Sequence, residues 1–149
     1  MKAIPTWILI ADGGRAYVVE RKRAADGLKK VPGLTFNGPH KLSRDIGTDK
    51  PGRAFSSVGS NRAALDDDKR LAREAEEKFL GAVVDHIDES LKGGAFERLV
   101  LAAPPRVLGV LRKRLSPRLS KALYGEIRAD LVKADLGQVA RQLDGMKRA

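Results

Sequence analysis

The 149-residue sequence contains no cysteine. Without a thiol it can form no disulfide framework, no thiol nucleophile, no iron–sulfur cluster and no cysteine-based zinc site. Histidine is almost as scarce, because only His40 and His86 are present, which excludes a metal site built from several imidazoles. We therefore expect neither a metal nor a cofactor.

Aromatic residues make up only 5% of the chain, so aliphatic side chains must fill the core. No apolar run reaches the ~18 residues that a membrane-spanning helix needs. The apolar stretch near the N-terminus is short, contains Pro5 and is followed at once by Asp12, so we interpret it as a buried strand rather than a signal peptide. The sequence thus predicts a protein that has no membrane attachment and stays in the cytoplasm.

Charge, in contrast, is abundant and unbalanced. The 29 Lys and Arg residues outnumber the 19 Asp and Glu residues, which gives a formal net charge of +10. Such a field attracts polyanions, and nucleic acid, the ribosome and anionic membrane surfaces are the ordinary candidates. The alternative is a basic surface that serves only solubility.

The apolar patterns predict the element order β-β-β-loop-α-β-α-β-α, and the length suits a single domain covering residues 1–149. We expect strands over 6–11, 17–19, 28–36, 98–103 and 124–131, and helices over 63–92, 105–115 and 135–143. In the longest helix, Asp66, Asp67 and Asp68 would occupy the first turn, where acids favour the helix dipole. This order predicts an α/β domain with a mixed β-sheet flanked by helices.

Residues 37–62 form a long basic loop in this scheme. The stretch is rich in Gly, Pro, Ser and Asn, and it carries five basic residues against two acids. Loops of this length without their own structure are usually functional or disordered. Both a binding loop and an insertion without a role therefore stay open.

The most basic segment is 104–128, with seven Lys and Arg residues against Glu126 alone. Leu108, Leu111 and Leu115 would face the core, which leaves the cations on the exposed side of a docked helix. Such a face suits contacts to a phosphate backbone, although a helix that is merely soluble is the alternative. The candidate RNA-binding residues are Lys50, Arg53, Arg62, Arg106, Arg112, Lys113, Arg114, Arg118 and Lys121.

Three stretches together resemble one family: WILIADGGRA at 7–16, DKPGRAF at 49–55 and LVLAAPPRVLG at 99–109. With Gly125-Glu126-Ile127 they are similar to the bacterial "host attachment" proteins over nearly the whole chain. That family in turn is similar to the middle domain of the archaeo-eukaryotic class-I peptide-chain release factors. The resemblance implies a release-factor-like fold and a ribosomal partner.

In those release factors, a Gly-Gly-Gln loop just before a long helix helps water to attack the peptidyl-tRNA ester. The equivalent place here holds Gly59-Ser60-Asn61, in which Ser60 departs from the second glycine and Asn61 is one methylene shorter than Gln. A carboxamide can donate a hydrogen bond to a developing oxyanion. The resemblance therefore implies Asn61 as a candidate catalytic residue, while a simple helix cap at Ser60 or Asn61 is the alternative.

These observations predict a cytoplasmic binding module for the ribosome or structured RNA, with a role in translation termination or ribosome rescue implied by the resemblance. A peptidyl-tRNA ester hydrolase that uses the loop Gly59, Ser60 and Asn61 is one alternative, so enzymatic activity stays open, with binding favoured. An adhesion-related protein, as the family's label suggests, is the other. The sequence indicates no oligomeric state.

Overall fold

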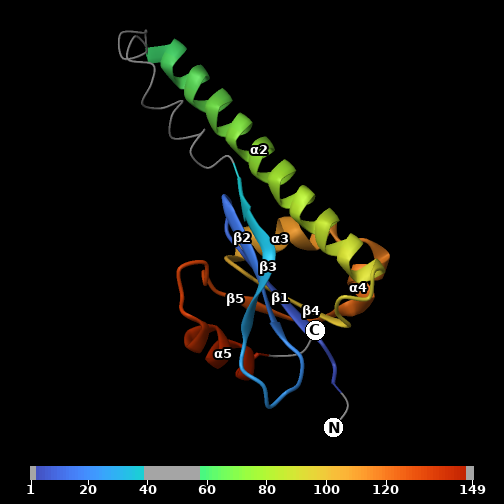
Figure 1. Ribbon diagram of the computed structural model, residues 1–149. Coiled ribbons are helices and arrows are strands. Elements are labelled where there is room, and N and C mark those ends of the chain that lie inside the picture. The colour runs from blue at the N-terminus through green and yellow to red at the C-terminus, as the bar shows by residue number, and fades with distance from the viewer. Residues whose placement is uncertain (1–2, 39–57, 147–149) are drawn as a thin grey trace.

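The computed structural model describes residues 3–38 and 58–146, and within that part the side chains of residues 58–62 are left out. The chain forms an α/β domain with a five-stranded mixed sheet flanked by helices, which confirms the predicted fold class (Figure 1). Its elements are β1 (Thr6–Ala11), β2 (Arg15–Arg21), β3 (Lys29–Asn37), α2 (Val58–Lys92), β4 (Arg98–Ala103), α3 (Pro105–Arg114), α4 (Pro117–Ala122), β5 (Leu123–Arg128) and α5 (Leu136–Asp144).

The strand order is β3-β2-β1-β4-β5. Strands β1, β2 and β3 pair antiparallel, whereas β4 and β5 continue parallel to β1. The turn between β1 and β2 is closed by Asp12, whose carboxylate accepts hydrogen bonds from the backbone N–H groups of Gly14 (2.8 Å) and Arg15 (2.7 Å). An Asp followed by two glycines is typical of such a turn.

Strand β3 forms one edge of the sheet, and it is irregular at Pro32-Gly33. Gly33 adopts a φ of 80°, which a residue with a side chain rarely takes. The pairing with β2 shifts register in the same region, between Tyr17 and Val19. The outer edge of β3 also carries Lys29 and Lys30 at its start.

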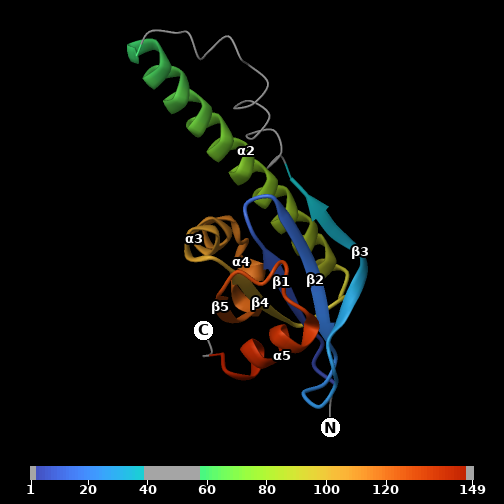
Figure 2. The same ribbon diagram turned by 90° about the vertical axis from the view of Figure 1, so that its left-hand side faces the viewer.

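Two cores cover the two faces of the sheet, because alternate residues of a strand point to opposite sides. Trp7 and Leu9 of β1 belong to the core on the side of α2, α3 and α4. Ile8 and Ile10 belong to the core on the side of α5, together with Val139. The result is a three-layer α/β/α arrangement (Figure 2), which explains why β1 is apolar and buried from Trp7 to Ala11.

Helix α2 has 35 residues and, at 1.5 Å per residue, is about 50 Å long. Only its C-terminal half buries an apolar stripe against the sheet, including Leu80, Val83 and Ile87. The N-terminal half extends beyond the sheet in both views, and Leu65 and Leu71 are exposed there (Figures 1 and 2).

The predicted start of this helix was wrong. It begins at Val58, not at residue 63, because extending a helix that has already nucleated adds one hydrogen bond for each residue fixed. Asp66, Asp67 and Asp68 consequently lie more than two turns inside the helix, and its first turn contains no acid. The expected stabilisation of these acids by the helix dipole therefore does not apply.

Two helix starts are defined by side-chain caps. Asp135 caps α5 with a complete capping box to Gln138, as the sequence predicted for its N-terminus. Ser116 accepts a hydrogen bond from the backbone N–H of Leu119 and so opens α4, with Pro117 in the first turn. This short helix was not among the elements predicted from the sequence. Among the helices of the described part, none combines the length and the apolar character of a membrane span.

Candidate nucleic-acid interface

Helix α3 presents its cations to solvent because its apolar residues face the sheet. Val107, Leu108 and Leu111 are buried in the core beneath it. The exposed surface of the helix, including both of its flanks, carries four of the predicted contact residues: Arg106, Arg112, Lys113 and Arg114. The sequence-based placement of these cations on the outside of a docked helix is therefore confirmed.

Helix α4 follows α3 after a break of two residues and is also basic. Leu119 is fully buried and anchors the helix, while Arg118 and Lys121 are exposed. Residues 104–122, which form both helices, contain these six cations and no Asp or Glu. We call the exposed side of the two helices, defined by these six residues, the basic face.

Three cations of the basic face are paired with carboxylates from other elements. Arg106 contacts Glu76 of α2, and the Nη1 of Arg118 lies 3.5 Å from Oδ1 of Asp88, also on α2. The structure thus places acids of α2 beside residues 104–122, which contain no acid of their own. Part of its positive charge is offset by these contacts.

The third pair joins Arg112 to Glu126 of β5 through two hydrogen bonds, Nε to Oε2 at 2.8 Å and Nη2 to Oε1 at 2.7 Å. This is the bidentate geometry in which a guanidinium holds a carboxylate best. The hydrogen bonds from Arg112 lower the pKa of Glu126, although partial burial of the carboxyl opposes the shift. The same contact raises the pKa of Arg112. The pair ties α3 to the adjacent strand.

The other three cations, Lys113, Arg114 and Lys121, make no ion pair with any residue in the described part of the chain. Arg114 lies across α2, so that a β-carbon at Gly81 would be 3.3 Å from its Nη1. A groove between α2 and α3 is lined by Lys113, Arg114 and acids of α2 that include Glu77 and Asp85. The side of the basic face toward α2 is therefore mixed in charge, and its outward side is positive.

The remaining predicted site residues do not belong to α3 or α4. Lys50 and Arg53, like most of the loop predicted over 37–62, lie outside the described residues. The backbone of Gly59, Ser60, Asn61 and Arg62 lies at the start of α2, so that these residues belong to the helix and not to a preceding loop. Figure 1 shows this end of α2 far from α3 and α4.

Glu76 was missed by the sequence analysis, and it connects two of the stretches that carry the family resemblance. Its carboxylate lies over Gly13 in the turn after β1, where a β-carbon would be 2.6 Å from Oε1, and it contacts Arg106 at the start of α3. Gly13 therefore permits a close approach that a larger residue would disturb. Nothing in the sequence sets Glu76 apart from the other acids of α2.

In residues 3–38 and 58–146, no group of three or more His, Asp or Glu side chains could hold a metal ion.

The fold is similar to part of a solved structure. The crystal structure of an archaeal translation termination factor, aRF1, is similar to this chain with a TM-score of 0.50 and 16% sequence identity. The similarity covers 83% of this chain and 29% of that one, so the two share a fold over less than a third of the termination factor. A search of curated protein sequences finds no significant match.

The family follows from the sequence itself. Residues 7–143 match the family described as "Protein required for attachment to host cells", and the chain belongs to that family. This confirms the resemblance that the three stretches at 7–16, 49–55 and 99–109 indicated.

Proposed function

We propose that this protein binds the phosphate backbone of structured RNA in the ribosome through the basic face. The observation that carries the proposal is the stretch 104–122, in which six cations and no acid are exposed on two consecutive helices. Phosphate contacts need a high density of positive charge and hydrogen-bond donors, and they need no base-specific geometry.

The ion pairs on the basic face do not prevent such contacts. The side chains of Arg106 and Arg118 are 61% and 49% exposed, and a guanidinium has five N–H donors, of which each pair uses only a part. Exposed ion pairs contribute little free energy, so a phosphate can compete with them. Lys113, Arg114 and Lys121 have no ion-pair partner in the described residues and carry most of the proposed contact, with Lys113 and Arg114 at the border of the groove toward α2.

The fold supports the choice of the ribosome among structured RNAs. One similar solved chain is a translation termination factor. Under this proposal the present protein acts in termination or ribosome rescue in the cytoplasm, with the basic face against ribosomal RNA.

Co-sedimentation with ribosomes at low salt tests the proposal. We expect the wild type to pellet with ribosomes, and the triple variant Lys113→Gln, Arg114→Gln, Lys121→Gln to stay largely in the supernatant. The matched control is Arg128→Gln, Lys133→Gln, Arg141→Gln, which removes three exposed cations outside the basic face. Absence of the wild type from the pellet, or equal loss in both triple variants, would contradict the proposal.

A role in attachment to host cells is a second candidate, because the family description favours it. Cell fractionation separates the two roles. Recovery of the protein only in the cytosol would exclude direct contact with a host surface, whereas recovery at the cell surface would favour it over ribosome binding.

Ester hydrolysis through Asn61 is a separate proposal, which rests on the carboxamide at the start of α2. Release of the peptide from peptidyl-tRNA on ribosomes should then fall strongly in Asn61→Ala while co-sedimentation is unchanged. Equal release by both proteins, or none by either, would leave binding alone.

A further inference from the structure

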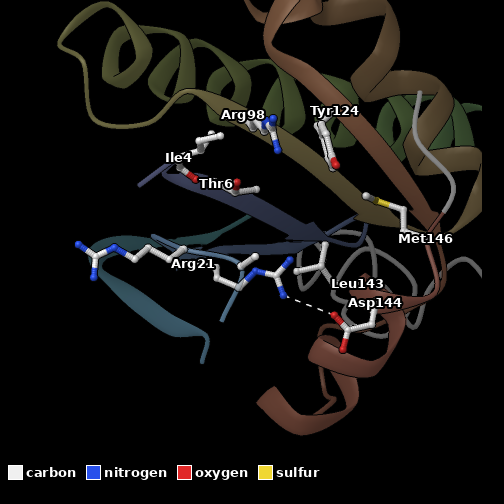
Figure 3. A pocket seen from close by; sticks show the side chains of 10 residues that line it. Ile4, Thr6, Arg21, Arg98, Tyr124, Leu143, Asp144 and Met146 are labelled. Carbon is white, nitrogen blue, oxygen red and sulfur yellow. Dashed lines mark hydrogen bonds and ion pairs between the residues drawn. The ribbon is translucent and has the colours of Figure 1, made fainter. Parts of the chain in front are cut away.

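A pocket of about 400 Å³ lies at the end of the sheet where β1, β4 and β5 begin and where β2 and α5 end (Figure 3). This volume falls within the range of roughly 300–1,000 Å³ that is usual for small-molecule sites. Its lining includes three arginines, Arg21, Arg23 and Arg98, and only one acid among the described lining residues, Asp144.

The sheet register gathers two of these arginines. Thr6 of β1 pairs with Arg21 of β2 on one side and with Arg98 of β4 on the other. Residues paired in this way project from the same face, so Arg21 and Arg98 flank Thr6 in one row across three strands, roughly 10 Å apart. Like charges gathered in this way repel each other, and an anion between them would relieve the repulsion.

Each side of the pocket holds its arginine in a different way. The guanidinium of Arg98 lies over the ring of Tyr124, 4.4 Å from its centroid, and this contact fixes its orientation. Across the pocket, Nη1 of Arg21 lies 3.5 Å from Oδ1 of Asp144, whose side chain is 72% exposed (Figure 3). An exposed pair at this distance is weak, so Arg21 can exchange Asp144 for another anion.

The rest of the wall is apolar. Ile4, Leu143 and Met146 contribute side chains, and the ring of Tyr124 adds an aromatic surface (Figure 3). The pocket therefore offers cations for an acidic group and an apolar wall for a flat or hydrophobic one. Three arginines against one aspartate leave two positive charges in excess, close to the charge of about −2 that a phosphate monoester carries at neutral pH.

We propose that this pocket binds the terminal phosphate monoester of a nucleotide, with the phosphate between Arg21 and Arg98 and the base against the apolar wall. A free mononucleotide and the 5′-phosphorylated end of an RNA strand both present this group. The site is distinct from the basic face, because none of the six residues that define that face lines the pocket.

Isothermal titration of the full chain with AMP at low ionic strength tests the proposal. We expect saturable binding of AMP by the wild type and none of adenosine, which lacks the phosphate. Arg98→Gln should weaken the binding about tenfold or more, because it removes a charge-assisted contact. Arg23→Gln should weaken it by a smaller factor, because it removes one of the three positive charges of the lining. Arg23 is exposed in the turn after β2, so its replacement keeps the test valid if loss of the Arg98 contact with Tyr124 destabilises the fold.

The matched control is Lys113→Gln, which removes one positive charge from the basic face and should leave the AMP affinity unchanged. A short oligoribonucleotide with a 5′-phosphate is compared with the same strand carrying a 5′-hydroxyl. This comparison distinguishes an RNA end from a free mononucleotide as the ligand of the pocket. Tighter binding of the 5′-phosphorylated strand than of the 5′-hydroxyl strand, by a margin that Arg98→Gln removes, assigns the pocket to RNA ends. Equal binding of the two strands assigns it to free nucleotides.

The proposal is overturned if the wild type binds no AMP, if adenosine binds as well as AMP, or if Lys113→Gln weakens binding as much as Arg23→Gln. Its failure is separable from that of the proposed function, because ribosome binding is tested with the triple variant of the basic face and AMP binding with the pocket variants.

Discussion

A single carboxylate, Glu126, joins the basic face to the sheet. Arg112 binds both of its oxygens and lowers its pKa, so the carboxyl stays ionised to a lower pH in the folded protein than in the unfolded chain. Linkage then gives the sign of the effect. The pair stabilises the fold fully at pH values above the pKa that the Glu126 carboxyl has in the unfolded chain. This contribution is lost as the pH falls through the lowered pKa of the same carboxyl in the folded protein.

Glu126→Gln should therefore lower the Tm at neutral pH and lose this effect in acid. The difference in Tm between wild type and variant should shrink as the pH falls below about 4.5, the ordinary pKa of the carboxyl, and vanish once Glu126 is protonated in the folded wild type. Thermal melts across the acidic range measure it, with Glu97→Gln as a control for loss of an exposed carboxylate. A difference in Tm that does not change with pH would contradict the role of the pair.

Among the elements, α2 combines two environments in one continuous helix. Its C-terminal half packs on the sheet and beside α3, whereas its N-terminal half extends beyond them (Figure 1). Tertiary packing supplies most of the stability of a helix in water. The two halves should therefore respond very differently to the same kind of substitution.

Leu80→Ala should destabilise the protein by about 2–5 kcal/mol, because Leu80 is completely buried and its loss leaves a cavity. Leu71→Ala is the matched control on the same helix, and with a side chain that is 49% exposed it should change the free energy of unfolding by less than about 0.5 kcal/mol. Urea denaturation of both variants measures the difference. Similar losses in the two variants would show that the N-terminal half is packed in solution.

Most elements could be predicted from local pattern, and the failures have local causes. The strand over 98–103 and the Asp135 cap were predicted as they stand, because an uninterrupted apolar run and a capping residue act within a few residues. The start of α2 was placed too late because the polar residues before position 63 show no apolar stripe. Helix α4 was missed because its six residues are too few for a periodicity.

The whole molecule carries a formal charge of +10, but the site depends on how that charge is distributed. Sequence predicted which side of α3 is exposed, since that depends on the spacing of its leucines. It could not predict that Arg106 meets Glu76, 30 residues earlier, because the packing of α3 beside α2 brings them together. It likewise could not predict the row of Arg21, Thr6 and Arg98, which exists only in the strand register.

The salt dependence of ribosome binding should report the number of phosphate contacts that the basic face makes. If Lys113, Arg114 and Lys121 each neutralise one phosphate, the triple Gln variant should reduce the slope of log affinity against log salt by about two to three. Co-sedimentation over a salt series measures both slopes. The control triple Arg128→Gln, Lys133→Gln, Arg141→Gln should keep the wild-type slope, and a parallel reduction there would assign the effect to net charge alone.

The irregular edge strand β3 bears on how copies of the protein behave when crowded together. Pro32 offers no backbone N–H to an incoming strand, and Lys29 and Lys30 would confront the same cations on a second copy. This edge therefore resists the strand-to-strand stacking that leads to aggregation. A protein rich in exposed charge can thus keep an open sheet without being drawn into fibrous self-assembly.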